Sequence, residues 1–416
     1  MESTTALPPS ASNEPTERAK PAWISSLVLA NMGINIAFFS AIQVFLPQQA
    51  EAFDPANKEA VLSLALTTGA IVSLVVTPIF GALSDRTASR FGRRLPWIVG
   101  GTLLAVVALL VLSGAPGVFV MVAAWCLVQT GANAALAALS AAIPDQVPSS
   151  QRGSVSGLFA MGQTVGIMLG ALIGAVVSGY AVGYVVAAVA LAACMSWFVL
   201  RRQDVVIAPG SVSRFEWLPF LRSFWISPRK HPDFAWAWFT RFMVNLGVFS
   251  FTNYMFFFLS DRVKYPDPAG GVFILTVEYA LSVVLFSVVG GFLSDRVGRR
   301  KVFVIAAAAV VCVAFMIVLF TQDWTGALIA APILGAGFGT FLAVDFALLT
   351  EVLPSSADRG KDLGVINVAA SLPQVIAPVV AGFVTTSVFG YSGLFVFGAI
   401  AAVIGAVFVT RIKGVR

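Results

Sequence analysis

The chain alternates between long apolar runs and short polar segments. Apolar runs of roughly 18 or more residues predict membrane-spanning helices. There are twelve such runs, centred near residues 35, 72, 105, 130, 166, 190, 247, 282, 311, 338, 375 and 400. A polar stretch at 201–232 separates the first six runs from the last six. The pattern therefore predicts an all-α membrane protein with twelve transmembrane helices in two six-helix bundles.

The polar segments set the expected boundaries. Residues 1–21 are polar and lack both the basic start and the cleavage pattern of a signal peptide, so we expect a disordered cytoplasmic tail. Residues 22–200 then form the N-terminal bundle, and 201–232 a cytoplasmic central loop. Residues 233–416 form the C-terminal bundle with a short cytoplasmic tail.

Composition and charge agree with a membrane location. Hydrophobic residues make up 58% of the chain and charged residues 11%, against about 45–50% and about 25% in soluble domains. Of the 26 Lys and Arg, 22 lie on one side of the predicted spans and three on the other, while Arg241 lies inside a span. The positive-inside rule then places both termini in the cytoplasm of a cell-membrane protein. The net charge of +6 is thus an orientation signal and does not indicate a nucleic-acid partner.

Two polar motifs occur once in each half. The first copy is Gly81-Ala-Leu-Ser-Asp-Arg-Thr-Ala-Ser-Arg-Phe-Gly-Arg-Arg94, and the second is Gly291-Phe-Leu-Ser-Asp-Arg-Val-Gly-Arg-Arg300. A further pair, Pro148-Ser-Ser-Gln-Arg-Gly153 and Pro354-Ser-Ser-Ala-Asp-Arg-Gly360, follows the fourth run of each half. The two halves are therefore related by duplication.

Both copies of the first motif resemble the signature loop of the major facilitator superfamily. The resemblance implies a secondary transporter that moves a small-molecule solute across the lipid bilayer. An acid at a helix end can accept backbone hydrogen bonds from a neighbouring helix and pair with arginine, so we expect a conformational latch. Its expected members are Asp85, Arg86, Arg93, Arg94, Asp295, Arg296, Arg299 and Arg300.

The first copy is longer than the second. It carries an inserted Thr87-Ala88-Ser89-Arg90 and continues as Leu95-Pro96-Trp97-Ile98. This spacing resembles the loop of plant-type sucrose transporters and of glycoside-pentoside-hexuronide:cation symporters, which implies a sugar or glycoside as solute. Melibiose-type cation symporters carry aspartates in the second helix. The polar residues that this chain offers there are only Ser63, Thr67, Thr68, Ser73 and Thr77, which makes a sodium site of that type doubtful. We therefore expect a proton as the coupling ion, with sodium as the alternative and no other cofactor or metal.

Several predicted helices carry a polar face, because positions four, seven or eleven apart lie on one side of a helix. Polar groups in hydrocarbon usually face the bundle interior or a wet cavity. The superfamily resemblance implies that helices one, four, seven and ten line the central cavity. Interhelical hydrogen bonding is the alternative role for these amides. The expected solute-binding residues are Asn31, Asn35, Trp125, Gln129, Asn133, Arg241, Asn245, Asn367 and Gln374.

Three charged residues lie inside predicted spans of the second half: Arg241, Glu278 and Asp345. Counting the direction of travel puts Arg241 and Asp345 at a similar depth, so they can pair. An ionisable pair in the membrane can couple protonation to solute binding or conformation. We expect Asp345, Glu278 and Arg241 to serve proton coupling, with a structural ion pair as the alternative.

The fifth run has glycines at four-residue intervals, Gly162, Gly166, Gly170 and Gly174, which favours close packing against another helix. Drug exporters of the superfamily carry a proline in this region, where this chain has Ile167. That departure argues against the nearest alternative, a proton-driven exporter of drugs or metabolites.

Two further alternatives belong to other classes. A non-transporting membrane sensor on the same fold would usually need an added soluble domain, and a membrane enzyme would need a catalytic motif that the sequence lacks. The expected function is therefore proton symport of a small polar solute by a monomer, without enzymatic activity.

Overall fold

The computed structural model describes residues 15, 17–201, 204–206, 229–351 and 359–413, except for the side chains of residues 346, 350, 351, 359–364 and 367. Within these ranges the secondary structure is entirely helical. Eleven helices are long and apolar enough to cross a membrane, and a bent pair brings the number to twelve. The predicted all-α membrane fold is confirmed.

The first half contains six spans. The first is continuous from Pro21 to Phe53 and consists of α1 (Pro21–Ser40), a π-helical segment η1 (Ala41–Phe45) and α2 (Leu46–Phe53). The other five are α3 (Lys58–Arg86), α4 (Leu95–Ser113), α5 (Val118–Gln146), α6 (Ser149–Val176) and α7 (Tyr180–Leu200).

The second half repeats this arrangement. Its first span is the bent pair, in which α9 (Pro232–Thr252) meets α10 (Met255–Phe257) and the π-helical segment η2 (Phe258–Val263) at an angle of 44°. The other five are α11 (Pro268–Val297), α12 (Arg300–Thr321), α13 (Trp324–Glu351), α14 (Arg359–Thr386) and α15 (Gly390–Thr410). Each predicted apolar run thus has its own span.

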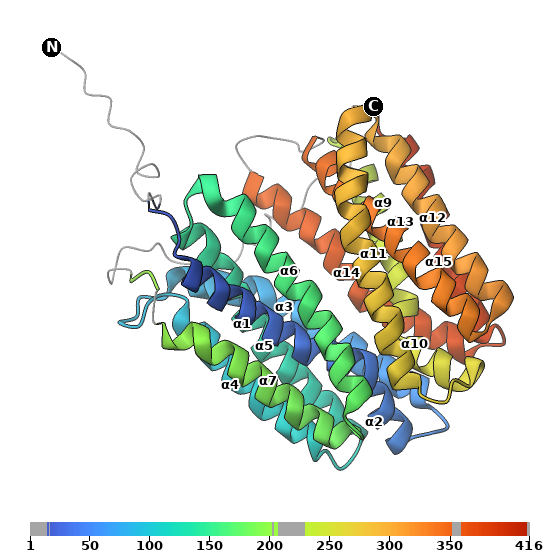
Figure 1. Ribbon diagram of the computed structural model, residues 1–416, viewed down its shortest axis with the longest axis horizontal. Helices are drawn as coiled ribbons and strands as arrows, with labels where there is room; N and C mark the ends of the chain where they lie inside the picture. The colour runs from blue at the N-terminus through green and yellow to red at the C-terminus, as the bar shows by residue number, and fades with distance from the viewer. Residues whose placement is uncertain (1–14, 16, 202–203, 207–228, 352–358, 414–416) are drawn as a thin grey trace.

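The two halves lie side by side in Figure 1, the first half at lower left and the second at upper right. Across the boundary between them, α14 packs against α3 and α11 packs against α6. We call the end with the α3–α4, α5–α6, α7–α9 and α11–α12 connections the terminal end, because α1 begins and α15 ends there. The opposite end, with the α2–α3, η2–α11 and α14–α15 connections, is the distal end.

The glycines of α6 permit close contact with α1. A methyl group at Gly166 would lie 2.6 Å from the Met32 carbonyl oxygen, and one at Gly170 would lie 2.9 Å from that of Ile36. Real side chains do not approach a backbone oxygen so closely, so only glycine fits at these positions. The close packing predicted for this run is confirmed.

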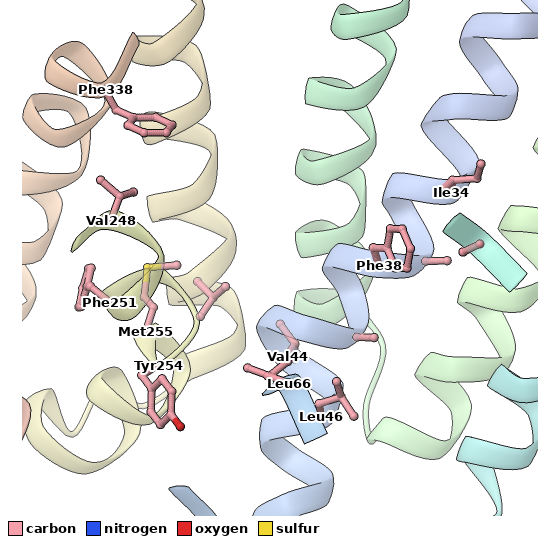
Figure 2. Packing of buried hydrophobic residues seen from close by; sticks show 14 of the residues in the cluster. Ile34, Phe38, Val44, Leu46, Leu66, Val248, Phe251, Tyr254, Met255 and Phe338 are labelled. Atoms are coloured by element: carbon pink, nitrogen blue, oxygen red, sulfur yellow. The ribbon is translucent and has the colours of Figure 1, made fainter. Parts of the chain in front are cut away.

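One buried apolar cluster extends through both halves. Figure 2 shows part of it, with Ile34, Phe38 and Leu46 from the first half and Phe251, Tyr254 and Met255 from the second. Apolar packing of this kind, with small residues at the closest contacts, is what associates helices in lipid. The polar residues described next stand out against this background.

Candidate functional site: buried polar groups between the helices

A buried ion pair joins α9 and α13 in the second half. Arg241 Nη1 donates a hydrogen bond to Asp345 Oδ2 at 2.9 Å. The Asp345 side chain is only 1% exposed and that of Arg241 only 12%. Removing charges from water is costly, so such a pair persists only with good geometry and partners. The structure thus brings together two charges that are 104 positions apart in the chain.

The Nε–H group of Arg241 does not take part in this ion pair. Its Nε is buried and has no hydrogen-bond partner among the described residues. Asn245, one turn further along α9, donates from Nδ2 to the Arg241 carbonyl oxygen at 2.8 Å. A buried donor without a partner costs free energy until a ligand, water or side chain accepts from it.

Three polar residues of α5 form a second buried group. Asn133 Nδ2 donates to both the backbone oxygen and Oε1 of Gln129, each at 2.8 Å. The Trp125 ring is fully buried between Phe38 of α1 and Gly69 of α3. Its indole Nε1 has no hydrogen-bond partner within the described ranges. This helix therefore also offers an unused buried donor.

The two asparagines of α1 lie at the contact with α6. Asn31 Nδ2 donates to the Phe159 carbonyl oxygen at 2.7 Å. Asn35 Nδ2 donates to the backbone oxygen and Oδ1 of Asn31 at 2.9 and 3.1 Å, and its Cβ faces Gly166. Asn31 thus joins two helices, which corresponds to the interhelical alternative named above, while the hydrogen bonds of Asn35 stay within α1.

The remaining polar residues expected at the site are more scattered. Gln374 on α14 is exposed, with one long hydrogen bond of 3.5 Å to the Ala370 carbonyl oxygen. The Asn367 side chain lies outside the described residues. Glu278 on α11 is half-buried, and its Oε2 has no hydrogen-bond partner in the described part of the chain.

The first copy of the repeated motif builds a compact ionic cluster at the terminal end. Arg94 contacts Asp85 at 2.5 Å and Asp145 at 2.9 Å, and it donates to Ser84 Oγ at 2.6 Å. Arg93 also pairs with Asp145. Arg86 instead donates to the Ala82 carbonyl oxygen at 3.1 Å. The cluster links α3, the α3–α4 connection and α5, all within the first half.

Asp204, which follows α7, completes this cluster. Its Oδ2 accepts hydrogen bonds from the backbone N–H groups of Arg94 and Leu95, each at 2.7 Å, at the start of α4. Burial raises the pKa of the Asp204 carboxyl, while these backbone donors favour its charged form. Sequence reasoning missed this residue, because a single acid in a polar connection carries no signal of a partner 110 positions away.

The second copy of the motif is far looser. Asp295 lies 3.6 Å from Arg300, and its side chain is 72% exposed. Arg296 and Arg299 are exposed as well. Two motifs of similar sequence thus have different surroundings.

A polar network that the sequence did not reveal joins the two halves at the distal end. Lys58 Nζ lies 2.7 Å from both Glu51 of α2 and Asp261 of η2. The Tyr391 hydroxyl of α15 lies 2.9 Å from Asp261 and 3.2 Å from Glu59 of α3. Lys58 and Asp261 were visible in the sequence only as isolated charges beside apolar runs.

Tyr254 and Ser63 extend this contact between the halves. The Tyr254 hydroxyl lies 3.1 Å from the Glu59 carbonyl oxygen and 3.3 Å from that of Pro378. Ser63 of α3 donates to the same Pro378 oxygen at 2.8 Å. Pro378 lies inside α14, and its carbonyl oxygen is within hydrogen-bond distance of both hydroxyls. Helix α14 is therefore hydrogen-bonded to α3 across the boundary.

Comparison with known protein families decides the assignment. The family model described as Major Facilitator Superfamily matches residues 28–277 and 266–415. The chain belongs to the major facilitator superfamily. The buried polar groups described above therefore belong to a multi-pass membrane transporter. Its two related six-helix halves agree with this family.

Two curated relatives match short segments of this facilitator. An uncharacterized symporter of Synechocystis is 58% identical over 36 residues, which are 9% of this chain and 7% of the relative. A probable 4-methylmuconolactone transporter of Cupriavidus pinatubonensis is 39% identical over 93 residues, or 22% of this chain and 21% of the relative. The matches thus span less than a quarter of either relative.

Solved transporter structures share the fold over nearly the whole chain. A peptide transporter bound to alafosfalin has a TM-score of 0.77 at 15% identity and covers 97% of both chains. The nucleoside transporter NupG has a TM-score of 0.76 at 13% identity and covers 94% of this chain and 99% of its own. A bacterial Spinster homologue in an inward-facing, occupied conformation has a TM-score of 0.73 at 14% identity and covers 95% and 97%. At these identities the likeness concerns the fold.

Proposed function

We propose that this facilitator is a secondary active symporter that moves a small polar solute together with a proton by alternating access. The observation that carries the proposal is the buried Arg241–Asp345 pair. A carboxylate enclosed in apolar surroundings can exchange its guanidinium partner for a proton, which changes the charge of the pair. Protonation of Asp345 releases the N–H groups of Arg241 from the pair. A solute that accepts hydrogen bonds from these groups therefore binds best when Asp345 is protonated.

One unused buried donor in each half supports solute binding. Arg241 Nε and Trp125 Nε1 lie on α9 and α5, two of the helices that line the central cavity in the superfamily. The amide oxygens of Asn133 and Asn245 can accept further hydrogen bonds, because only their Nδ2 groups are engaged in the contacts above. Donors and acceptors of this kind suit a sugar or glycoside, in keeping with the sequence of the first motif loop.

The membrane orientation is part of the proposal. We place the terminal end in the cytoplasm of a cell membrane, because 22 of the 26 basic residues belong to segments at that end. The ionic cluster of the first motif loop and the exposed Asp295–Arg300 pair of the second then lie at the cytoplasmic surface, where we expect latch contacts to form in another conformation. The network around Lys58 closes the opposite side.

A second candidate solute is a small organic acid or lactone. The 39% identical segment of the probable 4-methylmuconolactone transporter favours it. The free Nε of Arg241 supports the same class, since a guanidinium binds a carboxylate through two parallel hydrogen bonds. We assign both solute classes to the Arg241–Asp345 pair. One transport assay that includes solutes of both classes therefore shows which class is carried.

The test uses purified protein in liposomes that hold a pH-sensitive dye, with an outward or inward gradient of each solute. One panel contains sugars and glycosides, and the other contains small carboxylates and lactones. Symport predicts proton entry together with the solute. Counterflow, in which labelled solute exchanges without a proton gradient, measures binding and conformational exchange separately.

The decisive variant is Asp345→Asn, with Asp54→Asn at a partly exposed position in the α2–α3 connection as the control. We expect Asp345→Asn to abolish proton-driven accumulation while counterflow continues, and Asp54→Asn to change neither. Retention of proton-driven accumulation in Asp345→Asn would overturn the coupling role. Proton exit against solute entry would overturn symport itself.

A further inference from the structure

The first half contains a cavity that the transport proposal does not use. Its volume is about 320 Å³, and it lies between α3 and α4 over α5. Phe80 and Thr87 line it from α3, Trp97 and Gly100 from α4, and Gly131 and Ala134 from α5. Gly100 is exposed on α4, so the cavity reaches the outer surface of the bundle as a groove.

The groove exists because Gly100 has no side chain to fill it. A methyl group at Gly100 would meet no atom within 4 Å, which means that open space lies directly beside this helix. At Gly131 a methyl group would instead lie 2.4 Å from the Gly101 carbonyl oxygen. Gly131 is thus needed for the contact between α4 and α5, whereas Gly100 leaves room that nothing in the described chain fills.

The lining suits an apolar occupant. The Trp97 indole Nε1 donates to Thr87 Oγ1 at 2.7 Å, and the Thr130 hydroxyl donates to the Cys126 carbonyl oxygen at 2.8 Å. These polar groups therefore already have partners, and a hydroxylated solute would lose its hydrogen bonds with water without replacement. The Phe80 and Trp97 rings, 5.2 Å apart and edge to face, connect α3 to α4 beside the groove.

The groove depends on the features that distinguish the first motif loop from the second. Thr87, Pro96 and Trp97 belong to the longer first copy and line the cavity. Aligning the two copies on Arg86 with Arg296 and on Arg94 with Arg300 places Val297, Val302 and Phe303 at the corresponding positions. The second half therefore lacks the Thr–Trp hydrogen bond. This part of the loop has no role in the ionic cluster, so it needs another explanation.

The α3–α4 connection, which continues from the groove residue Thr87, carries an exposed positive charge at the terminal end. Arg90 is exposed in the α3–α4 connection, three residues after Thr87, with its guanidinium carbon 4.7 Å from the centre of the Phe91 ring. Phe91 is itself 53% exposed. Arg93 and Arg94 face inward to Asp145 and Asp85, so Arg90 is the loop arginine that faces outward. An arginine at the end of a span typically extends its charged group to the headgroup region.

We propose that this groove binds one acyl chain of an anionic phospholipid, whose phosphate lies beside Arg90. The apolar walls hold the chain, and the arginine supplies the charge that prefers an anionic over a zwitterionic headgroup. Basic pockets between helices at the cytoplasmic side bind such headgroups in other membrane proteins. The site is a lipid-binding site separate from the Arg241–Asp345 pair, and it does not depend on the identity of the solute.

Trp97 provides a direct probe, because bromine on an acyl chain quenches the fluorescence of a tryptophan that it touches. The chain has nine tryptophans, so the Trp97 contribution is the difference between each protein and its Trp97→Phe counterpart. The full chain is placed in vesicles that mix phosphatidylglycerol and phosphatidylcholine in equal amounts. Either the first or the second lipid carries the bromine.

We expect brominated phosphatidylglycerol to bind beside Trp97 about five-fold more strongly than brominated phosphatidylcholine, which corresponds to the effect of one arginine near the membrane surface. Gly100→Leu fills the groove and removes the Trp97 quenching by both lipids. Gly157→Leu, on α6 at a glycine that also has open space around it, is the matched control and keeps the quenching. Arg90→Gln keeps the quenching but lowers the preference to about one.

Unchanged Trp97 quenching in Gly100→Leu would show that the acyl chain does not occupy the groove. Equal quenching by the two lipids in the unaltered protein would overturn the preference for an anionic headgroup. Absence of Trp97 quenching, together with disulfide-linked dimers of a Gly100→Cys variant in membranes, would assign the groove to a second copy of the chain and overturn the proposal.

Discussion

The two ends of the molecule use ionic contacts in different ways. At the distal end, the contacts of Lys58 and Tyr391 join the first half to the second. At the terminal end, the strong pairs of Arg93 and Arg94 with Asp145 stay within the first half. A contact between halves must break when the halves separate, whereas a contact within one half can persist.

This difference indicates which interactions are part of the conformational cycle. The distal network holds the halves together in the conformation described here, and it must be lost when the distal end opens. The terminal cluster instead fixes the α3–α4 connection on its own bundle, so that the half moves as one body. Its proposed latch role then requires an additional contact with the second half, made in another conformation.

The largest expected effect on stability comes from Asp145→Ala. This change leaves Arg93 and Arg94 without their shared carboxylate, and the Arg94 side chain is only 4% exposed. Breaking a buried pair by removing one partner costs about 3–5 kcal/mol. We expect a clear loss of thermal stability in detergent, whereas an unchanged unfolding temperature would contradict the assigned role of the cluster.

Lys58→Met tests the distal network. The variant loses the only cation that the described contacts place between Glu51 and Asp261, and hydrogen bonds to charged groups contribute about 1.5–3 kcal/mol. We expect the population ratio of the distal-closed to the distal-open conformation to fall by at least about ten-fold. Spin labels at Asn57→Cys and Val388→Cys, two exposed distal positions, report the distance. An unchanged distribution would show that Lys58 does not hold this end closed.

Tyr391→Phe is a milder change at the same end. It removes only the hydroxyl that contacts Asp261 and Glu59 and keeps the ring against Phe258. The hydroxyl has a single proton to donate to a carboxylate, whereas Lys58 contacts two carboxylates and carries a charge. We therefore expect the same direction as for Lys58→Met with a smaller shift. A shift larger than that of Lys58→Met would mean that the tyrosine, and not the lysine, dominates the network.

Asp295→Asn should have the smallest effect. Asp295 is largely exposed and 3.6 Å from Arg300, and exposed ion pairs contribute about 0–1 kcal/mol. We expect an unfolding temperature close to that of the unaltered protein, in contrast to Asp145→Ala. A loss of stability similar to that of Asp145→Ala would show that the two copies of the motif are equivalent after all.

The sequence predicted the architecture well because each span needs a long apolar run, and such runs are local features. It also placed Arg241 and Asp345 at matching depths, since depth follows from counting residues along alternating spans. The surroundings of Asp204 and Lys58 could not be predicted, because their partners come from distant segments and depend on how the helices pack. Asn31 shows the same limit, since its polar face was visible but not its contact with Phe159 of α6.

Alternating access requires that the distal contacts between the halves break as the terminal end closes. Two label pairs on one protein background test it most directly: Asn57→Cys with Val388→Cys at the distal end, and Phe91→Cys with Val297→Cys at the terminal end. Cys126, Cys194 and Cys312 are replaced by serine in both. With Lys58→Met added, we expect a longer distal distance and a shorter terminal distance. A longer distal distance without any change at the terminal end would contradict it.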